Sequence, residues 1–133
     1  MTSTGAGPVR LCRLKRRSEF LEVARGRKVV TPAFVLQAQR RTGPDAQPTI
    51  GVGFTATRRL GKAVVRNRAK RRLRELARRI LPEFGEAGTN YVLIAREAVT
   101  TWPWRQMEAD LVSALDRLHR RLPRSPAASR HGS

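Results

Sequence analysis

The stretch GFTATRRLGKAVVRNRAKRRLREL, residues 53–76, decides the fold of this chain. It runs from an alternating apolar segment through a glycine turn at Gly61 into a basic helix, predicted over 63–81. Pro82 and Gly85 are expected to end that helix, because both residues interrupt helical structure. The apolar positions of the helix follow the i, i+3, i+4, i+7 spacing and form one stripe, which consists of Ala69, Leu73, Leu76, Ala77 and Ile80. The stretch therefore predicts a strand followed by an amphipathic helix that packs on a sheet.

Strands are predicted on both sides of a loop rich in turn-forming residues. The segment 49–57 alternates, with an apolar face of Ile50, Val52, Phe54 and Ala56. Its other face carries Gly51 and Gly53, which allow another group to approach the backbone closely. The segment 28–40, broken or bent at Pro32, also alternates, with Phe34, Leu36 and Ala38 on one face. We expect the two segments to pair as an antiparallel hairpin.

Three further segments complete the predicted secondary structure. Residues 17–25 form a short helix with Ser18 as its N-cap, and 102–122 form the last helix. The continuous apolar run at 90–95 predicts a central strand buried on both faces. The strand–helix–strand unit over 50–95 would join parallel strands, and such connections are normally right-handed.

The whole chain predicts a single α+β domain over 10–122. Its order is α-β-β-β-α-β-α, with helices packed on a mostly antiparallel four-stranded sheet. Residues 1–9 and 123–133 are predicted to be disordered. No apolar run approaches the roughly 20 residues that cross a bilayer, and the N-terminus has no secretory signal pattern. With Cys12 as the only cysteine, we expect a reduced, cytoplasmic setting without membrane association.

Positive charge is concentrated in two segments of the chain. The sequence has 28 Lys+Arg against 10 Asp+Glu, a formal net charge of +18. Residues 58–79 hold eleven bases and one acid, and 10–28 hold eight bases and two acids, so 16 of the 18 excess charges lie there. Clustered like charges repel unless an anionic surface neutralises them, which predicts a polyanionic partner. The alternative is a solvated helix face, but Glu75 is the only acid in 58–79 available for pairing along the helix.

The sequence offers little for catalysis. His119 is predicted on the polar side of the last helix as a solvated residue, and His131 falls in the predicted disordered tail. The acids occur singly or in pairs, without the convergence that metal-dependent nucleases need. There is no metal-ligand spacing and no phosphate-binding glycine motif. We therefore expect that no catalytic residue, metal or cofactor is held by the protein itself.

The bases are suited to nucleic acid. Of the 28, 24 are arginine, whose rigid fork contacts phosphate bidentately and stacks on bases, although a GC-rich genome would give the same bias. The basic pair 58–59 and Lys62 precede the helix, whose first N–H groups can bind phosphate. Asn67 can contact a base or a sugar hydroxyl, or it can cap the helix start. Phe20 and Phe34 can stack single-stranded bases or pack in the core.

At residues 53–76 the sequence resembles the protein subunit of bacterial ribonuclease P. The family pattern is a strand, a basic pair, a glycine turn and then Ala-Val-x-Arg-Asn-Arg-x-Lys-Arg, whose last part is Arg66-Asn67-Arg68-Ala69-Lys70-Arg71 here. The likeness extends to residues 14–20, 34–36 and 91–96, so it covers about 10–122.

The resemblance implies an accessory protein for a catalytic RNA. In this family the RNA subunit, with its bound magnesium, hydrolyses precursor tRNA to release the 5′ leader. The protein binds the RNA subunit and holds the single-stranded leader between its first helix and the sheet. The RNA-subunit contacts carried over by position are Arg58, Arg59, Lys62, Arg66, Asn67, Arg68, Lys70, Arg71, Arg72 and Arg74. The leader cleft carried over in the same way comprises Arg16, Arg17, Phe20, Phe34 and Gln37.

The family differs from the general rule for crossover connections, and this sequence differs from some family members at a few positions. The family crossover is left-handed, against the expectation from sheet geometry. Some members carry aromatics where this sequence has Ala24 and Gln37, which implies weaker stacking of the leader, and Glu97 adds an acid where some relatives are basic. No obligate protein partner is evident. The alternatives are a non-catalytic ribosomal or RNA-chaperone protein and a protein-only nuclease, against which the missing carboxylate cluster argues.

Overall fold

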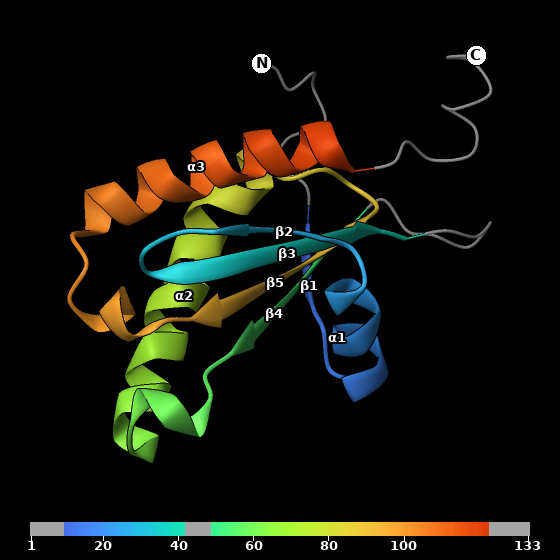
Figure 1. Cartoon of the computed structure of the whole chain (residues 1–133). Helices are drawn as coiled ribbons and strands as arrows, with labels where there is room; N and C mark the ends of the chain where they lie inside the picture. Colours follow the sequence, from blue (N-terminus) through green and yellow to red (C-terminus); the bar gives the residue numbers. More distant parts are fainter. Residues whose placement is uncertain (1–9, 42–48, 123–133) are drawn as a thin grey trace, which may run out of the picture.

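The strands form one mixed sheet in the order β1-β4-β5-β3-β2 (Figure 1). The computed structural model describes residues 10–41 and 49–122, so the predictions for both termini and for His131 lie outside the described residues. The strands are β1 (Leu11–Arg13), β2 (Arg27–Val30), β3 (Phe34–Arg40), β4 (Ile50–Thr55) and β5 (Thr89–Ala95). The helices are α1 (Arg17–Ala24), α2 (Ala63–Phe84) and α3 (Trp104–Arg121), with 3₁₀ turns η1 (Arg58–Leu60) and η2 (Glu97–Thr100). No helix among the described residues has the length and apolar character that a membrane span requires.

The α+β class and the order α-β-β-β-α-β-α are confirmed, but two details of the sheet are wrong. The sheet has five strands, because β1 adds a short edge strand that pairs parallel with β4. The sequence does not reveal β1, because a strand of three residues is too short to show an alternation of apolar and polar side chains. The sheet is also not mostly antiparallel, because β1–β4 and β4–β5 are parallel while β5–β3 and β3–β2 are antiparallel.

The predicted hairpin between 28–40 and 49–57 is also wrong, because β5 lies between β3 and β4. The apolar run of β5 needs cover on both faces, and the central position supplies it. The hairpin forms one step earlier, where the chain reverses at Pro32 and pairs β2 with β3. Thr31 holds this turn, since its hydroxyl donates to the Phe34 carbonyl at 2.7 Å and accepts from the Phe34 N–H at 3.1 Å.

The connection from β4 through α2 to β5 joins parallel strands, as predicted. In Figure 1 the arrows of β4 and β5 point to the lower left, α2 passes behind them, and β5 lies on the α3 side of β4. This arrangement is a left-handed crossover. The general rule for such connections gives the wrong hand, and the family resemblance gives the right one.

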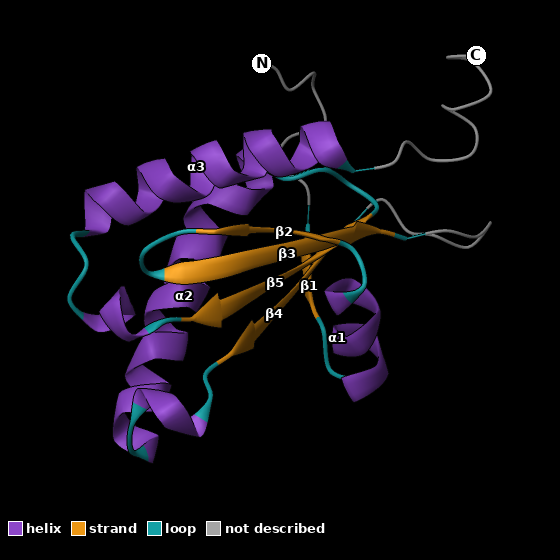
Figure 2. Cartoon of the chain, in the orientation of Figure 1, coloured by secondary structure: helices purple, strands orange, loops and turns teal. Residues whose placement is uncertain are grey.

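Helices cover the two faces of the sheet unequally (Figure 2). The long helices α2 and α3 lie on one face, which we call the closed face, and the short α1 lies on the other, which we call the open face. The closed face carries the main core, where alternate strand residues such as Leu36, Ile50 and Leu93 meet the predicted stripe of α2. The open face has only a small cluster of Leu14, Val23 and Val92.

The ends of two helices differ from the prediction. α1 is capped by Glu19 rather than by Ser18, because the Glu19 carboxylate accepts the backbone N–H groups of Lys15 and Arg16 at 3.0 and 2.9 Å. These hydrogen bonds hold the pKa of Glu19 below its usual value. α2 continues through Pro82 to Phe84, three residues beyond the predicted end, and Gly85 follows it. A proline in the last turn disrupts little of the helical hydrogen-bond ladder, so it does not stop the helix.

Candidate nucleic-acid interface

The approach to α2 presents three bases to solvent. Arg58 and Arg59 are exposed on η1, and Lys62 is exposed at the N-cap position of α2. Gly61 between them has a φ of 139°, a backbone conformation that residues other than glycine rarely adopt. The N-cap makes no side-chain hydrogen bond. The first N–H groups of α2 therefore lack a side-chain cap, in a position surrounded by positive charge.

The Arg-Asn-Arg segment lies in the first two turns of α2. Arg68 and Asn67 are exposed, and Arg66 is half-buried, as its position near the apolar stripe predicts. Asn67 does not cap the helix, because the helix begins four residues earlier at Ala63. Its carboxamide has no hydrogen-bond partner among the described residues. The structure therefore excludes the capping role for Asn67, and its contact with RNA stays a prediction.

The bases on the first half of α2 do not all belong to one surface. Arg71 is exposed and has no carboxylate partner within residues 10–41 and 49–122. Arg72 is different, because its NH2 donates to the Trp102 carbonyl at 2.7 Å and its guanidinium lies 5.5 Å from the centre of the Trp104 ring. Arg72 thus fastens α2 to the start of α3. Its assignment as an RNA contact stays a prediction, and Lys70 and Arg74 lie on a different side of the helix.

On the open face, glycine allows α1 to approach the sheet. A Cβ at Gly53 would lie 2.5 Å from Cζ of Phe20, so only a glycine leaves room for the ring. Phe20 is half-buried there and packs against the open-face cluster, as Ile94 does. This explains Gly53, whereas a Cβ at Gly51 would meet the side chains of Asn90 and Leu14 instead. Arg16 and Arg17 lie beside it at the exposed start of α1.

Phe34 cannot line a cleft on that face. Its side chain is fully buried in the main core on the closed face, opposite to α1. The alternation along β3 predicts that Phe34 lies on the same face as Leu36 and Ala38, and the structure confirms this placement. The assignment of Phe34 to the leader cleft is therefore wrong.

Side chains of the strands form the floor of the open face, and most of them are aliphatic while one, Gln37, carries a carboxamide. Gln37 is half-buried between Lys28 on β2 and Val92 on β5, which are its register partners. One row further along the strands, four residues pair in register and remain at least partly exposed: Val30, Val35, Ile94 and Thr55. Ala24 of α1 is exposed above this face. Among the described residues, Phe20 is the one aromatic side chain that packs against the cluster on this face.

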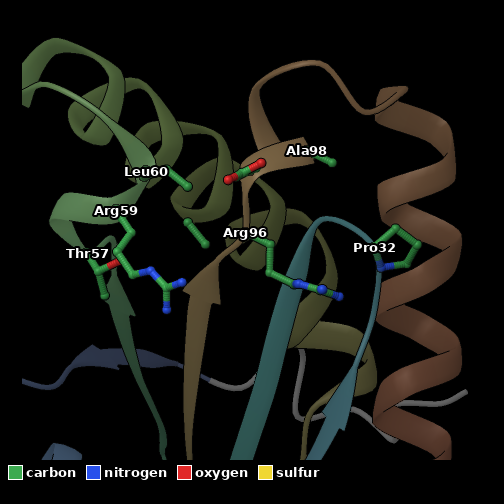
Figure 3. A pocket seen from close by; sticks show the side chains of 8 residues that line it. Pro32, Thr57, Arg59, Leu60, Arg96 and Ala98 are labelled. Carbon is green, nitrogen blue, oxygen red and sulfur yellow. The ribbon is translucent and has the colours of Figure 1, made fainter.

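A pocket of about 530 Å³ lies between η1 and η2, where β4 and β5 end (Figure 3). Arg59 and Arg96 reach into it from η1 and from the end of β5. Arg96 is held in place, because its NH1 donates to the Thr31 carbonyl at 2.8 Å. Glu97 also lines the pocket, so the acid that departs from the family pattern lies among its bases. The pocket adjoins the bases of η1.

The structure places His119 in a network that the sequence does not reveal. His119 is not a solvated residue, since its side chain is only 17% exposed and its Nε2 lies 2.6 Å from the hydroxyl of Tyr91. That hydroxyl also accepts the N–H of Glu86 at 2.9 Å, and it can donate its own proton to an unprotonated Nε2 of His119. Burial lowers the pKa of His119, against the opposing attraction of Glu86. The network is structural, because it joins β5, the end of α2 and α3.

Within the described ranges, no group of three or more His, Cys, Asp or Glu side chains is placed to hold a metal ion. What the geometry offers is a set of uncompensated bases around the start of α2 and a partly covered sheet face beneath α1. Such an arrangement can bind phosphates and a single strand.

Comparisons with known proteins agree on one family. The family model described as Ribonuclease P matches residues 9–119. A ribonuclease P protein component from Ruegeria pomeroyi is 46% identical over 107 residues, which cover 80% of this chain and 85% of the relative. One from Paramagnetospirillum magneticum is 42% identical over 111 residues, 82% and 84% of the two chains. The solved ribonuclease P protein of Thermotoga maritima has a TM-score of 0.63 at 26% identity, covering 79% of this chain and 96% of its own.

Proposed function

This chain belongs to the bacterial ribonuclease P protein family, and from that premise we propose that it binds the catalytic RNA subunit through the start of α2 and the 5′ leader of precursor tRNA through the open face. As a family member it is the protein component of a tRNA-processing endoribonuclease complex. The proposal concerns which surfaces of the protein make the contacts.

The observation that carries the proposal is the unpaired charge around the start of α2. Arg58, Arg59, Lys62, Arg66 and Arg68 have no hydrogen-bond or ion-pair partner for their side chains among the described residues. Two arginines in the second half of α2 do have partners, as the pairs Arg78–Glu75 at 3.6 Å and Arg79–Glu108 at 3.1 Å show. Acidic side chains thus pair with Arg78 and Arg79 near the end of α2, and none pairs with the described bases around the Arg-Asn-Arg segment. A phosphate backbone would neutralise the bases that are left.

The open face is the proposed site of the leader. It is bordered by Arg16 and Arg17, carries the Phe20 ring, and exposes the Gln37 carboxamide on its floor. A single strand can stack one base on Phe20 and present others to Gln37, while its phosphates meet the arginines. The aliphatic floor at Ile94 and Val35 provides no further ring, so stacking contributes less than on an aromatic floor.

We place the chemistry of cleavage in the RNA subunit, with magnesium held there. The protein's contribution is to bind and orient: the arginines neutralise phosphates of both RNAs, and the open face fixes the leader relative to the RNA subunit. No step of the hydrolysis then needs a side chain of this protein.

The test is cleavage of precursor tRNA by a bacterial ribonuclease P RNA at near-physiological magnesium, with and without this protein. We expect the protein to stimulate removal of the leader and to be inactive alone. Absence of stimulation would contradict the proposal, and would favour the alternative of a ribosomal or RNA-chaperone protein. Cleavage by the protein without RNA would show that the chain is itself a nuclease.

A first prediction concerns the Arg-Asn-Arg segment. Replacing Arg66 and Arg68 together by alanine removes two charged hydrogen-bond donors, each worth roughly 1.5–3 kcal/mol. Binding of the RNA subunit, measured by filter binding, should weaken by a few kcal/mol. The matched control is Arg105→Ala with Arg117→Ala, which removes the same charge from exposed positions of α3. Normal binding by the first variant would disprove this placement.

A further inference from the structure

The pocket between η1 and η2, which we call the end pocket, continues the open face beyond the ends of two strands (Figure 3). Alternate residues of an extended chain point to the same side. After β5, Arg96 follows Ile94 by two residues, and the backbone at Arg96 is extended. After β4, Thr57 follows Thr55 in the same way. Arg96 and Thr57 both line the end pocket, so a single strand on the open face can place its next base there.

The end pocket presents charges of both signs that do not neutralise each other. Arg59 lines it from η1, Arg96 from the end of β5 and Glu97 from the start of η2. Glu97 makes no ion pair and no hydrogen bond among the described residues, although two guanidinium groups line the same pocket. The Nε and NH2 atoms of Arg96 likewise have no partner within residues 10–41 and 49–122. A ligand that satisfies the pocket must therefore offer acceptors to an arginine and donors to a carboxylate.

The backbone that carries Arg96 and Glu97 is held in place by the fold. Arg96 donates from NH1 to the Thr31 carbonyl at 2.8 Å, and its backbone N–H donates to the Ala33 carbonyl at 3.0 Å. Val99 fixes η2, because its side chain is fully buried and its N–H donates to the Arg96 carbonyl at 2.9 Å. Binding of a ligand therefore requires little ordering of this part of the chain.

Guanine is the nucleobase that fits this pair of side chains. Its O6 and N7 atoms accept a bidentate arginine, and its N1–H and N2–H groups can donate to the two oxygens of a carboxylate. Adenine has no such pair of adjacent acceptors, and cytosine and uracil offer a carboxylate one donor group. Pro32, Leu60 and Ala98 provide apolar walls for the flat faces of a base. The volume of about 530 Å³ lies within the range of roughly 300–1,000 Å³ that small-ligand pockets span.

From this geometry we infer that the end pocket selects one unpaired guanine of the 5′ leader, which Arg96 contacts at O6 and N7 and Glu97 contacts at N1–H and N2–H. The inference rests on the proposed function, because that function places the leader on the open face. Glu97 disfavours a phosphate group in this position, and the two arginines disfavour a cation. Glu97 is thus a specificity-determining residue, which gives a role to the acid that departs from the family pattern.

The first experiment measures the binding of short single-stranded RNAs to the whole protein by fluorescence anisotropy. The RNAs have the sequence UUXUU, in which X is G, A, C or U, and the salt concentration is the same for all. We expect the RNA with guanine to bind roughly tenfold more tightly than the other three, because a well-placed bidentate contact discriminates between bases by about this factor. Equal affinities for the four RNAs would overturn the inference.

The deciding variant is Glu97→Gln, which keeps the size of the side chain and replaces one acceptor oxygen by a donor. Glu83→Gln is the matched control, since Glu83 is exposed near the end of α2 and does not line the pocket. Both variants lose one negative charge, so both should bind UUUUU slightly more tightly than the wild type does. We expect the preference for guanine to disappear in Glu97→Gln and to persist in Glu83→Gln. A preference that persisted in both variants would contradict the inference.

The second experiment asks whether the guanine belongs to the leader. Precursor tRNAs carry one guanine at successive positions of a leader that otherwise contains uridine, and their affinity for the complex of this protein with a bacterial ribonuclease P RNA is measured. We expect one position to raise the affinity roughly tenfold with the wild type and not with Glu97→Gln. If no position had this effect, the pocket would not select a leader base and the inference would be wrong.

The outcomes separate the inference from the proposed function. Stimulated removal of the leader, together with equal affinities for the four short RNAs, would overturn the inference alone. Absence of both stimulation and RNA binding by the wild type would overturn the proposed function and the inference together.

Discussion

Two neighbours on β5 show how differently the sheet's faces are built. Leu93 points into the core under α2 and α3 and is fully buried, whereas Ile94 points to the face of α1 and stays half exposed. The closed face is packed for stability. The open face keeps a ring, a carboxamide and aliphatic floor within reach of solvent, which is what a binding surface requires.

We expect the largest loss of stability from a substitution in the core of the closed face. Leu93→Ala should lower the free energy of unfolding by roughly 3 kcal/mol, because it leaves a cavity between the sheet and the two long helices. Ile94→Ala is the matched control on the same strand and should cost about 1 kcal/mol, since its side chain is only partly removed from water. Urea unfolding followed by circular dichroism measures both. Equal losses would contradict the difference between the faces.

A second change acts on the open face without entering the main core. Gly53→Val would displace the Phe20 ring, whose Cζ lies 2.5 Å from the position of a new Cβ. Loss of one stacked base costs about 1–3 kcal/mol, so affinity for leader-bearing precursor tRNA should fall roughly fivefold or more.

Mature tRNA without a leader is the control substrate, and its binding to the complex of this variant with the RNA subunit should not change. Phe20→Leu removes the ring and leaves Gly53 in place, so it should reproduce the loss. If both variants bound leader-bearing and leaderless RNA as the wild type does, the leader would not contact Phe20.

The smallest expected effect is a dependence of stability on pH. Burial lowers the pKa of His119 in the folded protein, so the unfolded chain binds the proton more readily. The contribution of this site is fully present above the ordinary histidine value of about 6.5 and is lost as the pH falls below it. In His119→Gln the free energy of unfolding should vary less between pH 7 and pH 5. An identical pH profile would show that burial does not favour the neutral ring of His119.

The sequence predicts what depends on local periodicity. The stripe of α2, the buried run of β5 and the alternation of β3 are all found where expected, because each is set by which residues must leave water. The insertion of β5 between β3 and β4 could not be predicted, since strand order depends on packing between distant segments.

In the candidate site, too, the sequence predicts the local features and not the contacts between distant segments. The charge pattern identified the start of α2, but it could not distinguish Arg72 from its neighbours, because the contact with Trp102 crosses 30 residues of sequence. His119 likewise finds Tyr91 only in the folded chain, 28 residues away. Phe34 shows the converse, since the strand periodicity placed it correctly in the core.

We propose that separate surfaces of the protein hold the two RNAs. The decisive experiment measures two properties of Arg66→Ala/Arg68→Ala and of Gly53→Val: the affinity for the RNA subunit, and the preference of the assembled complex for leader-bearing over leaderless tRNA. We expect the α2 variant to lose affinity for the RNA subunit and to keep the leader preference once it is assembled at saturating protein. We expect Gly53→Val to keep the affinity and to lose the preference. If either variant lost both properties, or if both variants lost the same one, the division of the protein into these surfaces would be contradicted.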